Sequence, residues 1–181
     1  MEIKHLFLID GYSLLYRSYY AIRNLSNSEG FPTNAIFGFL NTLKKINAQE
    51  KPHYLGIVFD SKGPTFRHEL YKAYKATRKP MPEDLVVQIP VLKKIISALN
   101  IPSFEHKGYE ADDLLGSLTK SAAKHNIQTV LVSTDKDLYQ LIDDSTVMFN
   151  PAKEIYIDKN EVLKLFGATP EQVVDVLALW G

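Results

Sequence analysis

Residues His5–Asp10 read HLFLID, an apolar run that ends in a carboxylate. Two later stretches repeat this form: Tyr54–Asp60 reads YLGIVFD, and Thr129–Ser133 reads TVLVS just before Asp135 and Asp137. Short, continuous apolar runs are typical of strands that are buried on both faces, as in a parallel sheet. The three stretches therefore predict three central strands, each with an acid at or just beyond its carboxyl end.

Longer stretches between these strands carry apolar residues at three- and four-residue steps, which predicts helices. Helices are expected at Asn34–Ala48, Glu83–Leu99 and Ala111–His125, with a kink at Pro90 in the second. Weaker signals give short strands at Pro102–Glu105, Thr146–Phe149 and Glu154–Ile157, a helical turn at Asp137–Leu141 and helix starts at Asp158 and Thr169. Alternating strands and helices predict an α/β fold with a largely parallel sheet.

The bulk composition bounds the class of protein. The chain has 181 residues, 45% of them hydrophobic, which suits one domain with a sizeable core. It has no cysteine, so disulfides, zinc thiolate sites and a thiol nucleophile are excluded. The apolar run near the N-terminus is too short for a signal peptide or a membrane span. A cytoplasmic, monomeric protein without a membrane partner is expected.

The segment 61–82 fits the strand–helix pattern least well. Its core reads SKGPTFRHELYKAYKATRKP, and its cations are interleaved with Phe66, Tyr71 and Tyr74. Those cations are Lys62, Arg67, Lys72, Lys75, Arg78 and Lys79. Cations beside aromatic rings suit single-stranded nucleic acid, because rings stack on unpaired bases while cations contact the phosphates. We expect a projecting loop or helical arch over one end of the sheet. A solvated amphipathic helix is the alternative.

Seven carboxylates are expected to gather at one edge of the sheet. Sites in open parallel sheets form beyond the carboxyl ends of the strands, where four of the acids lie. The other three start the helix before the third strand. The seven are Asp10, Asp60, Glu110, Asp112, Asp113, Asp135 and Asp137. Each acid alone could be a helix cap. Together they would repel one another strongly unless cations neutralised them, and carboxylates suit Mg²⁺ or Mn²⁺. Two such ions would serve phosphoryl chemistry.

Five longer motifs resemble a known family when taken together and in order. They are LIDGYSLLYRSYYAI, NAIFGFLNTL, VFDSKGPTFRHELYKAYKATRKPMPEDL, GYEADDLLGSL and VLVSTDKDLYQLI. The chain resembles the N-terminal 5′–3′ exonuclease domains of bacterial DNA polymerase I and the wider flap endonuclease family, along essentially its whole length. The resemblance implies one PIN-like, three-layer α/β domain over residues 1–181 with a mainly parallel sheet and a basic helical arch.

The resemblance also implies an activity and its site. Such nucleases remove 5′ flaps and RNA primers, so the expected partners are DNA with 5′ ends or flaps and RNA–DNA primers. By position, the first metal group would be Asp10, Asp60, Glu110, Asp112 and Asp113, with Asp135 and Asp137 toward a second ion. Arg17 and Lys75 match residues that contact the scissile phosphate, and Arg78 a further phosphate contact. Tyr74 would stack on the terminal nucleotide, with Arg67 and Lys72 also facing substrate.

The chain departs from the family at its end. The family continues after the ALWG motif with two more acids and a duplex-binding region, whereas this sequence stops at Gly181. We expect a truncated form whose second metal site is incomplete, with weak duplex binding and low activity.

Two other functions remain open at this point. One is a PIN-type ribonuclease on single-stranded RNA, which would share the acids but not need the basic segment. The other is a non-catalytic module that binds nucleic-acid ends. A haloacid-type phosphatase is disfavoured, because Asp10 is followed by Gly-Tyr-Ser and not by a second aspartate two residues on.

Overall fold

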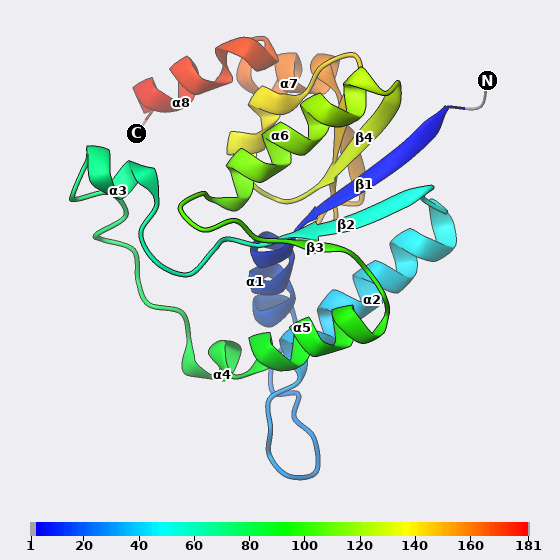
Figure 1. Ribbon diagram of the computed structural model, residues 1–181, viewed down its shortest axis with the longest axis vertical. Coiled ribbons are helices and arrows are strands. Elements are labelled where there is room, and N and C mark those ends of the chain that lie inside the picture. Colours follow the sequence, from blue (N-terminus) through cyan, green and yellow to red (C-terminus); the bar gives the residue numbers. More distant parts are fainter. Residues whose placement is uncertain (1–2, 181) are drawn as a thin grey trace.

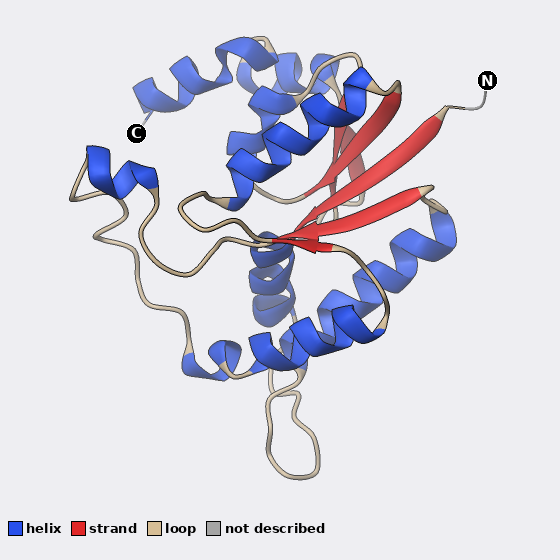
Figure 2. Cartoon of the chain, viewed as in Figure 1, coloured by secondary structure: helices blue, strands red, loops and turns tan. Residues whose placement is uncertain are grey.

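A single six-stranded sheet forms the centre of the computed structural model, which describes residues 3–180. The strand order is β3-β2-β1-β4-β5-β6, and only β6 runs antiparallel to its neighbour. The strands are β1 Lys4–Asp10, β2 Tyr54–Val58, β3 Ser103–Phe104, β4 Ile127–Val132, β5 Thr146–Asn150 and β6 Ile155–Ile157. The predicted α/β fold with a mainly parallel sheet is confirmed (Figures 1 and 2). Gly181, which ends the ALWG motif, lies outside the described residues.

Helices cover both faces of the sheet (Figure 1). On one face lie α1 Gly11–Ala21, α2 Asn34–Gln49, α4 Glu83–Val86 and α5 Gln88–Ala98. On the other lie α6 Ala111–Lys124, α7 Lys159–Phe166, α8 Val173–Trp180 and the 3₁₀ turns η1 Lys136–Leu141 and η2 Pro170–Gln172. Among residues 3–180, no helix is long and apolar enough to cross a membrane.

Strand β1 shows why its sequence is apolar without alternation. Successive side chains of a strand point to opposite faces of the sheet. Phe7 and Ile9 pack into the core beneath α1, α2 and α5, whereas Leu8 packs into the core beneath α6. All three are almost completely buried. A sheet with two covered faces therefore requires apolar residues at every position of its central strand.

The expected helix over Glu83–Leu99 is divided, and the break precedes the predicted kink. Helix α4 ends at Val86 and α5 starts at Gln88, on either side of Val87. Pro90 has no backbone N–H, so it cannot donate to the carbonyl of Val86 four residues earlier, and its ring crowds that carbonyl. The proline thus acts one turn upstream of its own position.

Strand β3 is short but decides where α6 begins. It pairs in parallel with the end of β2, with Ser103 opposite Ile57 and Phe104 opposite Val58. The backbone N–H of Phe59 donates to the carbonyl of Phe104 at 2.9 Å. This pairing brings the chain back to the carboxyl end of β2 before α6 starts.

The segment 61–82 projects at the carboxyl ends of the strands, as the sequence predicted (Figure 1). It is less helical than the word arch implies, since it holds only α3 Phe66–Leu70. After α3 the backbone forms successive turns with hydrogen bonds between residues three apart, and Lys75 takes a left-handed φ of 55°. That conformation is unfavourable within a helix, so the turns do not merge into one. We call residues 61–82 the arch.

Candidate metal and nucleic-acid site

The acids that follow the central strands meet at one edge of the sheet. Strand β1 lies between β2 and β4 and is parallel to both. Its last residue is Asp10, while Asp60 follows β2 and Asp135 follows β4. The carboxyl ends of parallel neighbours lie side by side, so the three carboxylates come from adjacent strand ends.

Asp10 is held on both of its oxygens. Its side chain is the N-cap of α1, where Oδ1 accepts the backbone N–H of Ser13 at 3.0 Å. Oδ2 accepts the hydroxyl of Ser133, which follows β4, at 2.9 Å. Only 6% of Asp10 is exposed. The carboxylate is therefore fixed by α1 on one side and by β4 on the other.

Asp60 positions the start of α6 and with it Asp112. Oδ1 of Asp60 accepts the backbone N–H of Ala111, the first residue of α6, at 2.8 Å. This bond ties the positive end of the helix dipole to the carboxylate after β2. Asp112, the next residue, then faces the acids at the strand ends.

The pKa values report how close these acids are. Burial raises the pKa of Asp10 to about 6, with further increases from Asp60 and Asp135. Burial also raises the pKa of Asp112 to about 7, and repulsion by Asp10, Asp135 and Asp60 adds to it. Repulsion from Asp60 and Asp135 thus acts on both Asp10 and Asp112, so the four carboxylates lie close enough to interact electrostatically.

Asp135 and Asp137 extend the cluster along η1. Oδ1 of Asp135 accepts the backbone N–H of Asp137 at 3.0 Å, so Asp135 caps this 3₁₀ turn. Burial raises the pKa of Asp137, repulsion from Asp135 raises it further, and Lys75 lowers it. Both acids thus belong electrostatically to the strand-end group.

The remaining two acids lie against the arch instead. Both oxygens of Asp113 accept from the Arg67 guanidinium, each at 2.8 Å. The carboxylate of Glu110, which is buried, accepts the Tyr74 hydroxyl at 3.0 Å and Lys75 Nζ at 3.1 Å. The Arg67 guanidinium holds the pKa of Asp113 below its usual range. The motif GYEADD is therefore divided: Asp112 faces the strand ends, whereas Glu110 and Asp113 bind arch cations.

The strand-end acids suit a hard divalent cation in chemistry. All their donor atoms are carboxylate oxygens, which Mg²⁺ and Mn²⁺ prefer, and their repulsion is the kind that a bound cation relieves. Within residues 3–180, however, no three carboxylate or imidazole side chains are arranged to hold an ion directly.

A cavity of about 310 Å³ opens beside the acids, between α1 and the arch. Arch cations, the strand-end acid Asp60 and the arch-bound Glu110 line it together with Tyr12 and Tyr16 of α1, two residues that the sequence did not single out. Its lining includes Tyr12, Tyr16, Asp60, Lys62, Lys75, Arg78, Lys79 and Glu110. The spacing Asp10, Tyr12, Tyr16 along a helix that starts at Gly11 is the signal that could have found them, because residues four apart share a helix face.

Three of the predicted substrate contacts lie in different settings. Lys72 and Arg78 are exposed on the arch, free to meet solvent or a ligand. Arg17 lies on another side of α1, where it lines a cavity of about 150 Å³ with Lys45 and Glu154. Lys45, and to a smaller extent the Arg17 charge, hold the pKa of Glu154 below its usual range. The structure thus groups Arg78 with the acids and places Arg17 near the turn between β5 and β6.

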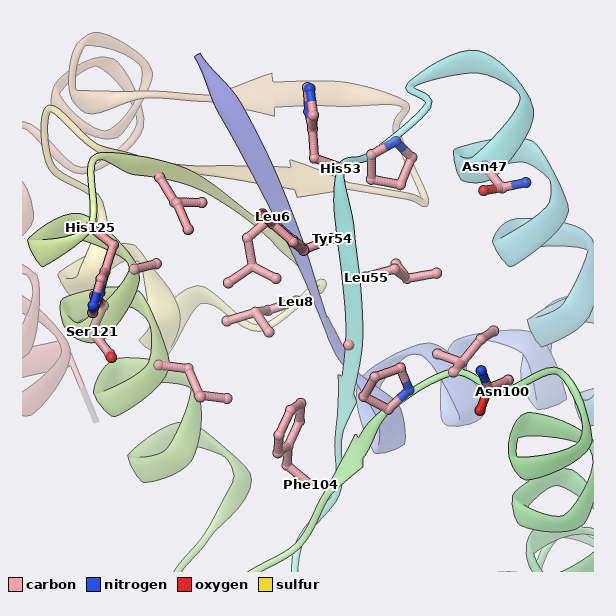
Figure 3. A pocket seen from close by; sticks show the side chains of 17 residues that line it. Leu6, Leu8, Asn47, His53, Tyr54, Leu55, Asn100, Phe104, Ser121 and His125 are labelled. Carbon is pink, nitrogen blue, oxygen red and sulfur yellow. The ribbon is translucent and has the colours of Figure 1, made fainter. Parts of the chain in front are cut away.

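A larger cavity of about 620 Å³ lies toward the amino ends of the strands. Figure 3 shows it between α6 and the strands β2 and β3, with Leu6, Leu8 and Phe104 in its lining. No carboxylate is among its lining residues in the described chain. The chemistry therefore points to the strand-end edge and not to this cavity.

Comparison with known proteins decides the family. Residues 5–167 match the family described as the N-terminal resolvase-like domain of 5′-3′ exonucleases. The chain belongs to this 5′–3′ exonuclease family. A 5′-3′ exonuclease of Aquifex aeolicus is 42% identical over 179 residues, 99% of this chain and 62% of that protein. DNA polymerase I of Bacillus subtilis is 40% identical over 184 residues, 99% of this chain and 21% of the polymerase.

Solved structures show that the chain shares the fold of phage T5 nucleases. T5 5′-exonuclease with divalent zinc ions bound superposes with a TM-score of 0.75 at 20% identity. A T5 flap endonuclease in complex with DNA and metal ions gives 0.71 at 18% identity. Each comparison covers 94% of this chain and 64% of the other. The chain therefore spans less than two thirds of these exonucleases and about a fifth of the polymerase.

Proposed function

We propose that this exonuclease domain hydrolyses nucleic-acid phosphodiesters at 5′ ends and 5′ flaps, in DNA and in RNA primers paired to DNA, with Mg²⁺ or Mn²⁺. One observation carries the proposal. Four carboxylates gather at the strand ends, where burial and neighbouring charges raise the pKa values of Asp10 and Asp112, beside a cavity lined by arch cations and two tyrosines of α1. Such a site can hold metal ions and a phosphodiester side by side.

The strand-end acids are the proposed metal ligands. Asp10, Asp60 and Asp112 would hold one ion, with Asp135 and Asp137 toward a second. When bound, such ions lower the pKa of water and neutralise charge that develops on phosphate oxygens. Asp10 is already fixed on its protein side by Ser13 and Ser133, so only its outward lone pairs are available to an ion.

Glu110 and Asp113 complete the proposed first metal group, although both carboxylates already accept hydrogen bonds from the arch. Glu110 accepts from Tyr74 and Lys75, and Asp113 accepts from Arg67, so an ion at either carboxylate competes with these arch contacts. Metal binding would then free these same arch side chains to contact substrate. The geometry supports an exchange in which phosphate replaces carboxylate as the partner of Arg67 and Lys75.

The arch supplies the proposed substrate contacts. Lys75 is close enough to Asp112 to lower its pKa, which puts its ammonium group beside the metal ligands and in reach of a scissile phosphate. Arg78 and Lys72 would contact neighbouring phosphates, and Tyr74 would stack on an unpaired terminal base. Arg17 stays in the proposal as a phosphate contact, with less support from the geometry because it lines a separate cavity.

Single-turnover cleavage tests the function. A 5′-labelled flap DNA, a blunt duplex and an unstructured RNA are each mixed with excess protein and Mn²⁺. We expect metal-dependent cleavage of the flap, at a rate that Asp112→Asn lowers at least 100-fold. Asp144→Asn is the matched control, because Asp144 is an exposed acid near the amino end of β5.

Other outcomes of the cleavage assay would favour a different function or contradict the proposed one. Cleavage of the unstructured RNA in preference to the flap would favour a single-strand ribonuclease. Binding of the flap without any metal-dependent product, or equal rates for Asp112→Asn and wild type, would contradict the proposal.

A further inference from the structure

Three hydroxyl groups form a hydrogen-bonded chain behind Asp10. Thr134 Oγ1 lies 3.0 Å from Ser13 Oγ, Ser13 Oγ lies 3.0 Å from Ser133 Oγ, and Ser133 Oγ lies 2.9 Å from Oδ2 of Asp10. Two backbone groups join it, since the N–H of Thr134 donates to Ser13 Oγ and that of Asp135 donates to Ser133 Oγ, both at 3.1 Å. The chain links the start of α1 to the end of β4.

The direction of this chain follows from counting protons. A serine or threonine hydroxyl has one proton to donate, and an ionised carboxylate can only accept. Ser133 therefore donates to Asp10, and its lone pairs accept from the Ser13 hydroxyl and from the Asp135 N–H. Ser13 in turn accepts from Thr134. Every donor points toward Asp10, and aligned hydrogen bonds of this kind strengthen one another.

A single atom, Ser133 Oγ, contacts both proposed metal-ligand groups, the Asp10 carboxylate and the Asp135 backbone. Ile9 of β1 is opposite Val132 of β4, so Asp10 and Ser133 are the next residues along the two neighbouring strands. Ser133 is 1% exposed, and its side chain is short enough to keep the hydroxyl between Asp10 and the backbone of Asp135. Alanine at this position would leave Asp10 with one fewer donor and the Asp135 N–H without its acceptor.

We propose that Ser133 is a positioning residue that fixes the Asp10 carboxylate and the Asp135 backbone relative to each other, with Ser13 and Thr134 as its support. This inference rests on the proposed function, since it concerns the same metal ligands. Groups that bind the ligands of a metal orient them, and their loss typically lowers metal affinity about 10- to 100-fold. Ser133 would act on both proposed ions, because Asp10 and Asp135 serve different ones.

The test measures Mn²⁺ affinity directly, by electron paramagnetic resonance of free Mn²⁺ in titrations of the whole chain without nucleic acid. Ser133→Ala is compared with wild type and with Ser18→Ala. Ser18 is a matched control, because it is equally buried and its hydroxyl donates to the Leu14 carbonyl within α1. We expect Ser133→Ala to weaken Mn²⁺ binding about 10- to 100-fold and Ser18→Ala to leave it within two-fold.

A second variant covers the case in which Ser133→Ala does not fold. Ser13→Ala removes a donor to Ser133 but keeps the contact between Ser133 and Asp10, so a smaller loss of about 3- to 10-fold is expected, within the range of such supporting contacts. Wild-type affinity in both folded variants, or equal loss in Ser18→Ala, would overturn the role of Ser133 while leaving the proposed function intact. Failure of the wild-type chain to bind Mn²⁺ would overturn both.

Discussion

The burial of Asp10 and Asp112 beside other carboxylates costs free energy of folding in the metal-free protein. Each is removed from water beside other carboxylates, and each titrates well above the usual range of an aspartate. Hydrogen bonds from Ser13 and Ser133 offset part of this cost at Asp10, and the Lys75 charge offsets part of it at Asp112, but the pKa of each carboxyl stays raised. Carboxyl groups with pKa values raised in this way are typical of functional sites, where a bound ligand can supply a neutralising positive charge.

The raised pKa values of Asp10 and Asp112 predict how the stability of the metal-free protein depends on pH. The folded pKa values of about 6 and about 7 lie above the reference value of 3.8, so between these limits the folded state binds more protons than the unfolded chain. The free energy of unfolding therefore falls as the pH rises from about 4 to about 7, by on the order of 5 kcal/mol for the two carboxyl groups together. Urea unfolding in EDTA, at pH values across this window, measures it.

The double variant Asp10→Asn, Asp112→Asn is the comparison for that prediction. It lacks both titrating groups, so its free energy of unfolding should depend much less on pH in the same window. An identical pH dependence in wild type and double variant would contradict the assignment. Adding Mn²⁺ should remove the decrease in wild type alone, because a bound cation favours the ionised carboxylates.

Gly11 controls the approach of α1 to the end of β2. A Cβ atom at this position would lie 2.4 Å from the ring of Phe59, which is almost completely buried. We expect Gly11→Ala to lower the free energy of unfolding by about 1–3 kcal/mol through overpacking. Gly116→Ala is the control, since its Cβ would meet only the flexible end of Leu141 at 3.2 Å and alanine favours the helix. Equal effects in thermal unfolding would contradict the argument.

At the level of elements, the arch is fastened to α6 by side chains. Arg67 joins α3 to Asp113 by two parallel hydrogen bonds, while Tyr74 and Lys75 join the later turns to Glu110. Bidentate arginine–carboxylate pairs are among the stronger polar contacts. Both attachment points lie in the first turn of α6, so the position of the whole arch depends on where that helix begins.

Removing the stronger attachment should loosen the arch without unfolding the domain. We expect Arg67→Ala to speed tryptic cleavage after Lys72 and Arg78 about ten-fold, because local opening of a segment tracks its few remaining contacts. Global stability should change by less than about 1 kcal/mol, since Arg67 is partly exposed. Mass spectrometry of the fragments identifies the sites.

Lys93→Ala provides the comparison for the arch. It removes an ion pair between α5 and Glu105, away from the arch. Unchanged cleavage after Lys72 in Arg67→Ala, or equal acceleration in Lys93→Ala, would show that the Arg67–Asp113 contact does not fasten the arch.

The sequence predicted those helices and strands that are determined by patterns of neighbouring residues. The apolar runs ending in Asp10 and Asp60 gave the central strands, because burial on both faces leaves no other pattern. Helix α1 was not predicted as an element, since GYSLLYRSYYA mixes polar and aromatic residues without a clear apolar stripe. Contacts across the fold were also out of reach: Arg67 and Asp113 are 46 residues apart, and nothing local decides which cation meets which acid.

At the scale of the whole molecule, charge is segregated and not merely balanced. The formal net charge is +0, yet exposed cations gather on the arch and acids, of which Asp10 and Glu110 are buried, gather beside it. Such a pair of opposite regions attracts a phosphate backbone to the arch while keeping it off the bare carboxylates. Cations at the acids would reverse that repulsion.

Salt dependence measures how many arch cations meet phosphates. Lys62, Lys72, Arg78 and Lys79 are exposed, so they give a slope of log affinity against log salt of about −3 for single-stranded DNA. The double variant Lys72→Ala, Lys79→Ala should reduce this slope to about −1.5 in fluorescence anisotropy. Lys120→Ala, Lys124→Ala, on α6, is the matched control. Equal changes in the two double variants would contradict binding by the arch.

Anomalous diffraction from crystals soaked in Mn²⁺ shows directly whether the strand-end carboxylates bind a divalent ion. We expect a peak at the strand ends, within about 2.2 Å of carboxylate oxygens of Asp10 and Asp112, as for hard cations on oxygen ligands. The Asp112→Asn protein should lose this peak. Peaks confined to surface acids such as Asp144, with none among the strand-end carboxylates, would contradict this expectation.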